Sequence, residues 1–203
     1  MKNLAIVLLA AGNSSRLGQP KQLLPFINGS LLRYQCAQAL SVTKQVSCVI
    51  GYQAMAMSKE INGFAIEKIT NPLWQQGLSS SIAQGIAALD DKIDGALLLL
   101  IDQWQVTAND LQQVIDIWQK NTEIIVAATK GFASDQIIGP PVIFPRKYFH
   151  ALINHDSDNG AKVLLKKYQK QVEKFVLPHA FIDLDTPKQL VYMQSHLAKS
   201  NQQ

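Results

Sequence analysis

Two uninterrupted apolar runs constrain the fold of this chain more than any other feature of its sequence. Residues 4–9 read LAIVLL and residues 95–101 read GALLLLI, with no polar side chain at alternate positions. A strand with one face in water alternates apolar and polar residues, whereas a strand covered on both faces is apolar throughout. Both runs therefore predict central strands of a mostly parallel sheet with helices on both faces.

The remaining apolar pattern alternates between strands and helices. Further strands are predicted at 46–52, 65–69, 124–128, 142–144 and 172–177. Apolar residues at helical spacing predict helices at 31–40, 54–61, 82–89, 111–118, 147–153, 161–168 and 187–197. Hydroxyl residues that can cap helices are Ser30, the serines at 79–81, Thr107 and Thr186. This order predicts an α/β fold, a doubly wound, mostly parallel sheet in three layers.

Composition places the chain among soluble globular proteins, with 47% hydrophobic and 17% charged residues. Its 203 residues suit one domain, which we expect to span 1–199, followed by a disordered tail at 200–203. The net charge of +4 is mild, and the basic residues are dispersed along the chain. We therefore expect neither nucleic acid nor a membrane as a partner.

The cysteines and the first residues indicate the compartment. Cys36 and Cys48 lie in apolar surroundings without C-x-x-C spacing, which favours free thiols in a reducing compartment. The first strand begins almost at once, without the pattern of a signal peptide, and no apolar run is long enough to span a bilayer. The sequence predicts a cytoplasmic protein.

The loop after the first strand has the composition of a polyphosphate site. Small side chains at Ala10, Ala11 and Gly12 let a ligand approach the backbone, where successive N–H groups can form an anion-binding nest. Arg16 offers a planar fork for phosphate oxygens, and Lys21 offers a mobile point charge. The spacing matches neither a Walker A loop nor the G-x-G-x-x-G fingerprint.

Polar or small residues follow several predicted strands at the same edge of the sheet. Gly12, Gly51, Asn71 and Asp102 each come directly after an apolar run, and parallel sheets bind ligands at the carboxyl ends of their strands. An unpaired carboxylate at Asp102 would be costly unless a positive charge lay beside it. Mg²⁺ with phosphate ligands suits this position, because Mg²⁺ takes one or two carboxylates and completes its shell with phosphates and water.

Two motifs resemble those of a known family. Residues 9–25 follow the pattern L-A-A-G-x-S-x-R-x-G-x-P-K-x-L-L-P, which resembles the signature of the MobA-like NTP transferases. Residues 71–81 follow N-P-x-W-x-x-G-x-x-S-S, which resembles the molybdenum cofactor cytidylyltransferase branch. The resemblance implies a Rossmann-like nucleotidyltransferase fold and Arg16, Lys21 and Asp102 as catalytic residues. It implies that the nucleotide is bound by Leu9, Ala10, Ala11, Gly12, Gly51, Asn71, Gly77 and Ser81.

The resemblance also implies the metal ligands, where one alternative stays open. Asp102 is followed by Gln103 and Trp104, whereas the family usually has Asp-Gln-Pro. Residues 181–187, FIDLDTP, resemble a D-I-D-T-P motif whose acid reaches the same metal, and the motif favours Asp185. Asp183 and Asp185 share a face of an extended segment, so spacing does not distinguish them. Trp104 and Trp74 lie in predicted loops, and we expect both to wall the crevice.

Two later segments resemble the acceptor side of the same branch. Residues 139–146 resemble G-x-P-x-x-F, and residues 156–162 resemble G-D-x-G-A-R, with Ser157 in place of glycine and Lys162 in place of arginine. The implied acceptor-binding residues are Gly139, Pro141, Asp158 and Gly160.

The implied reaction transfers CMP from CTP to the phosphate of molybdopterin or the molybdenum cofactor, with Mg²⁺ as cofactor and pyrophosphate released. A molybdoenzyme or its chaperone is an implied recipient of the product. The alternatives are a guanylyltransferase that uses GTP, a sugar- or alditol-phosphate nucleotidyltransferase, and, from another class, a non-catalytic nucleotide-binding module or cofactor chaperone.

Overall fold

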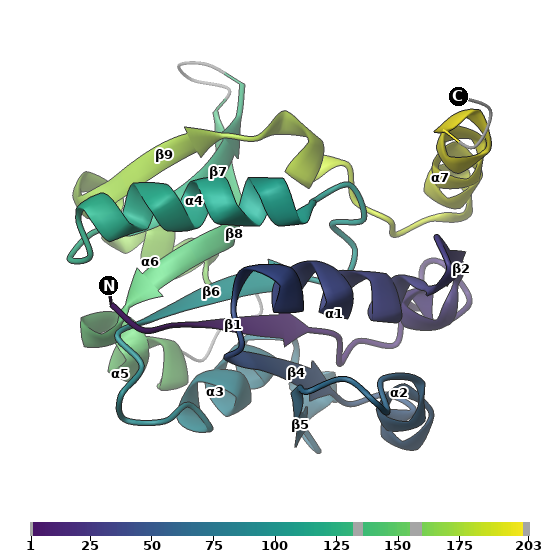
Figure 1. Cartoon of the computed structure of the whole chain (residues 1–203), viewed down its shortest axis with the longest axis horizontal. Helices are drawn as coiled ribbons and strands as arrows, with labels where there is room; N and C mark the ends of the chain where they lie inside the picture. The colour runs from purple at the N-terminus through teal and green to yellow at the C-terminus, as the bar shows by residue number, and fades with distance from the viewer. Residues whose placement is uncertain (1, 132–135, 155–159, 201–203) are drawn as a thin grey trace.

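A computed structural model of the chain describes residues 2–131, 136–154 and 160–200. Its centre is a seven-stranded sheet in the order β5-β4-β1-β6-β8-β7-β9 (Figure 1). The strands are β1 (Leu4–Leu9), β4 (Val46–Ile50), β5 (Glu67–Thr70), β6 (Gly95–Leu100), β7 (Ile125–Lys130), β8 (Ile137–Pro145) and β9 (Val172–Val176). Only β8 runs antiparallel to its neighbours in this sheet, so the predicted mostly parallel sheet is confirmed.

Helices cover both faces of the sheet. The longer helices on one face are α1 (Leu31–Val42) and α4 (Ala108–Lys120), both in front of the strands in Figure 1. The opposite face packs against α3 (Leu78–Ala87), α5 (Phe149–Ile153) and α6 (Lys162–Lys167). Short α2 (Ala54–Glu60) and C-terminal α7 (Pro187–Ser200) join the first of these cores through Met57 and Met193.

The central strand β1 explains the unbroken apolar run. Leu4, Ile6 and Leu8 belong to the core under α1 and α4, whereas Ala5 and Val7 belong to the core over α3. Alternate side chains of a strand point to opposite faces, so both faces of this strand are buried. The three-layer arrangement predicted from the sequence is confirmed.

Helix starts follow the predicted caps in three places and depart from them in one. Ser30 accepts a hydrogen bond from the Arg33 N–H at the start of α1, and Thr107 and Asp110 form the expected capping box of α4. Thr186 accepts a hydrogen bond from the Gln189 N–H at the start of α7. The prediction that the serines at 79–81 precede a helix was wrong. Gly77, with φ of 92°, turns the chain, and α3 begins directly after it at Leu78.

Strand β8 is much longer than the predicted segment 142–144, since it extends over Ile137–Pro145. Pro140 and Pro141 obscured it in the sequence, because proline lacks an N–H and usually marks the end of a strand. A two-stranded hairpin, β2 (Pro25–Phe26) and β3 (Gly29–Ser30), precedes α1.

The parallel strands bring the predicted site loops to one edge. Leu9 is paired with Val49 on one side and with Leu100 on the other, so β1, β4 and β6 end level with one another. Ile50 is in turn paired with Thr70 of β5. The loops that follow these strands therefore begin side by side, as predicted.

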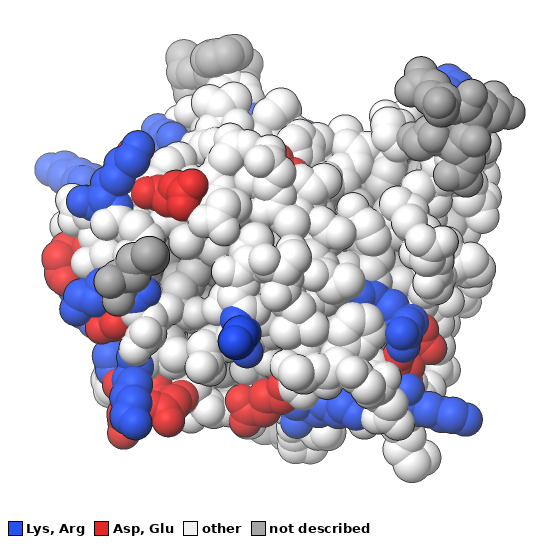
Figure 2. All heavy atoms as spheres, viewed as in Figure 1, with Lys and Arg blue, Asp and Glu red and all other residues white. Residues whose placement is uncertain are grey.

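Two surface properties follow from this arrangement. Within the described ranges, no helix is long and apolar enough to cross a membrane. On the face shown in Figure 2, Lys and Arg side chains lie beside Asp and Glu side chains instead of forming one continuous stripe.

Candidate active site

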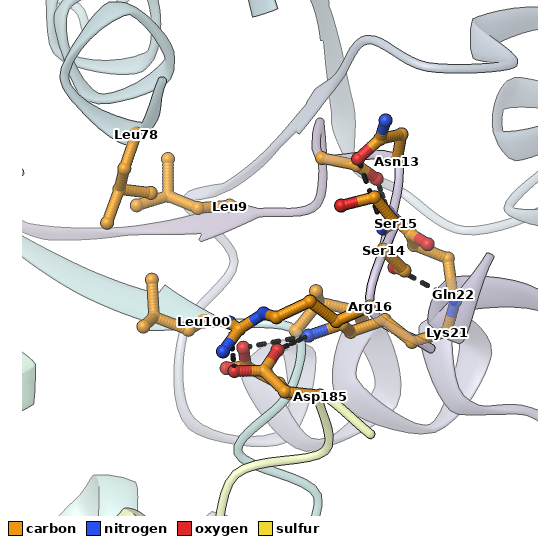
Figure 3. Close-up of a pocket in the computed structure, with 13 residues that line it drawn as sticks. Leu9, Asn13, Ser14, Ser15, Arg16, Lys21, Gln22, Leu78, Leu100 and Asp185 are labelled. Carbon is orange, nitrogen blue, oxygen red and sulfur yellow. Dashed lines mark hydrogen bonds and ion pairs between the residues drawn. The ribbon is translucent and has the colours of Figure 1, made fainter. Parts of the chain in front are cut away.

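Two adjoining cavities open at the carboxyl edge of the parallel strands. The first, of about 270 Å³, lies between the loop after β1 and the acids Asp102 and Asp185 (Figure 3). The second, of about 450 Å³, lies beside the segment before α3. Both cavities are lined by Leu9, Gly12, Asn13 and Leu78. A ligand that fills both would therefore pass over the loop after β1.

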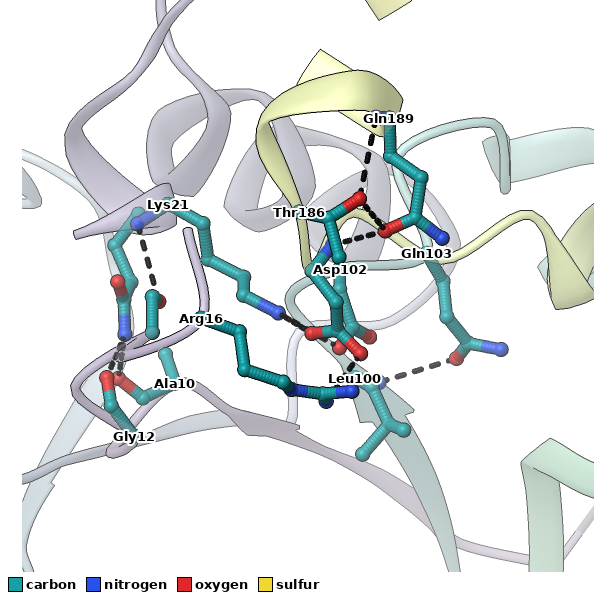
Figure 4. Close-up of polar contacts among 12 residues, drawn as sticks. Ala10, Gly12, Arg16, Lys21, Leu100, Asp102, Gln103, Thr186 and Gln189 are labelled. Carbon is teal, nitrogen blue, oxygen red and sulfur yellow. Dashed lines mark hydrogen bonds and ion pairs between the residues drawn. The ribbon is translucent and has the colours of Figure 1, made fainter. Parts of the chain in front are cut away.

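Lys21 lies at the centre of the first cavity's charged cluster (Figure 4). Its Nζ is 3.0 Å from Oδ2 of Asp102 and 2.6 Å from Oδ1 of Asp185. Arg16 reaches the other oxygen of Asp185, with 2.7 Å between Nη2 and Oδ2. Three segments far apart in the sequence therefore meet here: the loop after β1, the end of β6 and the segment before α7.

Burial and charge both act on the protonation of Lys21. Burial on its own would lower the pKa of the ammonium group, but the charges of Asp102 and Asp185 and their hydrogen bonds outweigh it and raise that pKa above its ordinary value. Lys21 is therefore positively charged near neutral pH. The Lys21 side chain is 8% exposed, whereas that of Arg16 is 72% exposed.

Asp183 is the other acid that sequence spacing left open. It makes no ion pair within the described residues, although burial and the negative charges of Asp102 and Asp185 raise the pKa of its carboxyl group. The charge of Lys21 opposes that rise. Of these two acids, Asp185 is the one that Lys21 and Arg16 contact directly. The structure therefore brings Asp185, and not Asp183, into the charged cluster.

Gln22 shapes the loop after β1, which sequence analysis did not foresee. Its Nε2 donates to the carbonyl oxygens of Ala10, at 2.7 Å, and Gly12, at 2.8 Å. The Ala11 carbonyl accepts from the Tyr52 N–H at 2.9 Å. These carbonyls are thus satisfied by the protein, whereas the N–H groups of Gly12 and Asn13 have no acceptor in the described parts of the chain. Donors of this kind suit an anion.

The second cavity combines an aromatic wall with small residues. Trp74, Gly77 and Ser81 line it, and the Trp74 ring meets the Tyr52 ring edge-on with 5.5 Å between their centres. Asn71 does not line this cavity, but its buried amide donates to the hydroxyls of Ser80 and Ser81. The Asn71 side chain therefore connects the end of β5 to the first turn of α3.

The structure separates the predicted nucleotide residues into two groups. Those that line the two cavities are Leu9, Ala11, Gly12, Gly77 and Ser81. Those that do not line them are Ala10, Gly51 and Asn71. A Cβ atom on Gly51 would lie 2.6 Å from Cβ of Trp74 and 2.9 Å from the Ala11 carbonyl oxygen, so this glycine allows two loops to touch.

Of the predicted acceptor residues, Gly160 lies beside the cavities. A Cβ atom on Gly160 would be 2.8 Å from Leu78, which lines both cavities, and one on Gly139 would be 3.5 Å from the Phe181 ring. Pro141 is buried in β8. Asp158 and Ser157 lie outside the described residues.

The expectation that Trp104 walls the crevice was wrong. Its side chain is 2% exposed and packs edge-on against the rings of Phe26, Tyr192 and His196. The large apolar ring turns into the core between the hairpin and α7, where burial is favourable. Trp74 does line a cavity, as predicted.

A comparison with models of known protein families identifies the family of this chain. The family model for the MobA-like NTP transferase domain matches residues 6–172. The chain belongs to this family. The matched region includes the loop after β1, the segment before α3 and Asp102 of this MobA-like transferase. The resemblance predicted from its motifs is confirmed, whereas the metal and catalytic roles of single residues stay predictions.

Curated relatives of this MobA-like protein carry different names. It is 30% identical over 167 residues to nicotine blue oxidoreductase of Paenarthrobacter nicotinovorans, spanning 79% of this chain and 80% of that protein. It is 32% identical over 90 residues to molybdenum cofactor cytidylyltransferase of Escherichia coli, spanning 44% of this chain and 47% of that protein. It is 26% identical over 204 residues to the probable molybdenum cofactor guanylyltransferase of Nostoc sp., spanning 96% of this chain and 92% of that protein.

Solved structures share the fold. Rv0371c from Mycobacterium tuberculosis H37Rv superimposes with a TM-score of 0.79 at 25% identity, covering 95% of this chain and 97% of that one. A structure of Rv0371c in complex with manganese gives a TM-score of 0.74 at 24% identity, covering 95% of this chain and 98% of that one. The Rossmann-like nucleotidyltransferase fold predicted from the sequence is therefore confirmed.

Proposed function

We propose that this MobA-like protein transfers CMP from CTP to the phosphate of molybdopterin or the molybdenum cofactor and releases pyrophosphate. The observation that carries the proposal is the cluster of Lys21, Asp102 and Asp185 beside a loop with free backbone N–H groups. Phosphoryl transfer needs positioning and charge stabilisation more than covalent catalysis, and this cluster supplies both.

The residues at the cluster fit a divalent cation. Asp102 and Asp185 come from different segments and both contact Lys21, and Oδ1 of Asp102 is buried without a hydrogen-bond partner. No group of three or more His, Cys, Asp or Glu side chains among the described residues is arranged to hold a metal ion. Two carboxylates completed by phosphate and water are the set that Mg²⁺ prefers. Bound there, Mg²⁺ would neutralise charge on the phosphates.

Each cationic side chain has a separate task in the proposed reaction. An oxygen of the acceptor phosphate attacks the α-phosphorus of CTP, the bond to the bridging oxygen of the β-phosphate breaks, and pyrophosphate leaves. Lys21 would neutralise charge at the α-phosphate, and exposed Arg16 would bind the β- and γ-phosphates. The acceptor phosphate is already ionised near neutral pH, so no general base is needed.

The choice of CTP rests on the segment before α3. Trp74, Gly77 and Ser81 form a cavity that suits a flat base, with an aromatic wall, a glycine and a hydroxyl. The relatives named for cytidylyl and guanylyl transfer make GTP the first alternative. A sugar or alditol phosphate is the alternative acceptor.

A screen of the four nucleoside triphosphates with Mg²⁺ tests the nucleotide. We expect CTP to raise the melting temperature more than the other three, because ligand binding to the folded state adds stability according to affinity. Pyrophosphate release with molybdopterin should follow the same preference. A larger shift with GTP would replace the cytidylyltransferase by the guanylyltransferase.

The same assay distinguishes the proposed transferase from alternatives that belong to other functional classes. A non-catalytic module or chaperone would show a melting shift with a triphosphate but no pyrophosphate release. The relative named as an oxidoreductase adds a further alternative, for which all four triphosphates would stay intact during turnover.

Replacing Gly12 by alanine tests the loop after β1. No atom lies within 4 Å of the place a Cβ would take, and Gly12 lines both cavities, so the fold should be kept while the methyl group fills space for the phosphates. We expect CTP affinity, measured by calorimetry, to fall at least about tenfold. Ser41→Ala is the control, because Ser41 lies exposed on α1, lines neither cavity, and its hydroxyl donates only to the Gln38 carbonyl. Equal CTP affinities in the two variants would contradict the assignment.

A further inference from the structure

The charged cluster already contains a cation in the structure as described. The Lys21 ammonium contacts one oxygen of Asp102 and one of Asp185, and its side chain is almost entirely removed from solvent. Arg16, by contrast, contacts only Asp185 and lies largely in water. Lys21 is therefore the buried counter-charge of both acids.

A divalent cation and this ammonium group compete for the same oxygens. Mg²⁺ or Mn²⁺ bound by both acids would take carboxylate oxygens of Asp102 and Asp185, and the Lys21 ammonium that now contacts these acids would then lie next to a double positive charge. Such a contact is strongly repulsive in a site with little water. Either Lys21 leaves the carboxylates or the metal ion does not bind.

A bound nucleotide would give Lys21 a second set of anionic partners besides the two carboxylates. It lines the first cavity together with Gly12, Asn13 and Arg16, where the phosphates would lie if the proposed function is correct. Lysine has a flexible stem and a compact charge, so a short movement can exchange carboxylates for phosphates. The departing ammonium would leave Asp102 and Asp185 free for the metal ion.

We propose that Lys21 acts as a stand-in cation, which occupies the metal site of the free protein and makes metal binding conditional on the nucleotide. This inference rests on the proposed function, because it takes Asp102 and Asp185 as metal ligands and a triphosphate as the group that displaces Lys21. It adds an order to the binding: the two acids become metal ligands only when phosphates have drawn Lys21 away.

The test measures Mn²⁺ binding without any nucleotide, by electron paramagnetic resonance of the free ion. We expect Lys21→Met to bind Mn²⁺ at least about tenfold more tightly than the wild type, because two acids lose their resident counter-charge. Lys130→Met is the matched control. Lys130 also acts on Asp183 electrostatically, but its Nζ donates to the Phe181 carbonyl and contacts neither Asp102 nor Asp185. Its Mn²⁺ affinity should stay within about threefold of the wild type.

A second measurement covers the case in which Lys21→Met is unstable without metal. Lys21→Gln keeps a donor for one carboxylate without the charge, and Mn²⁺ should raise its melting temperature while leaving that of the wild type unchanged. Equal Mn²⁺ affinities in the wild type and both variants, tight or weak, would overturn the inference. Pyrophosphate release by the wild type is measured separately, so the proposed function could stand when this inference fails.

Discussion

Asp102→Ala is expected to lower the rate of nucleotidyl transfer on the order of a thousandfold, the loss typical of removing one group that stabilises transition-state charge. Asp102 contacts Lys21, and the other carboxylate oxygen of Asp102 is buried without a partner, so the proposed metal ion would lose one of its two carboxylate ligands in this variant. Lys21 keeps Asp185 as a counter-charge, so the fold should survive. Pyrophosphate release measures the rate, and circular dichroism checks the fold.

Two isosteric variants serve as the comparison. Asp185→Asn should cause a loss similar to that of Asp102→Ala, since this carboxylate contacts both Lys21 and Arg16. Asp183→Asn should stay within about tenfold of the wild type, because Asp183 makes no ion pair within the described residues. Near-normal turnover in Asp102→Ala would remove the proposed mechanism. A larger loss in Asp183→Asn than in Asp185→Asn would transfer the metal role to Asp183.

The sequence was sufficient for the central strands and the edge that carries the site. Continuous apolar character reports burial on both faces, which local composition reveals without tertiary information. It was insufficient where backbone geometry decides an element's limits. Gly77 starts α3 earlier than the serines suggest, and Pro140 and Pro141 lie inside a strand that proline normally ends.

The candidate site was predictable to the extent that its residues lie in motifs. Lys21, Asp102 and Asp185 were expected to converge, and they do. The amide of Gln22 was not foreseen, because its bonds to the loop carbonyls depend on how the chain folds back after Pro20. Trp104 comes shortly after the motif residue Asp102 but belongs to the core, because its large ring is buried against the rings of Phe26 and Tyr192.

Gln103 shows most clearly what a motif does not reveal. Its Oε1 accepts from the Leu100 N–H at 3.2 Å, and its Nε2 donates to the carbonyls of Pro140, at 2.6 Å, and Ala180, at 2.9 Å. Its own carbonyl accepts from Gln35 at 2.7 Å. One buried side chain thus connects the end of β6, the strand β8 and the segment that leads to α7.

Gln103→Leu is therefore expected to lower the free energy of unfolding by about 3 kcal/mol or more, because three backbone groups lose their partners and each costs on the order of 1 kcal/mol or more. Urea denaturation measures the change. Gln105→Leu is the matched control, because Gln105 is partly exposed and its side chain makes no hydrogen bond within the described residues; its change should stay within about 0.5 kcal/mol. Turnover should fall in Gln103→Leu as well, since the end of β6 carries Asp102 and the segment after Ala180 carries Asp185. Equal stability of the two variants would show that these three hydrogen bonds do not connect the segments of the site.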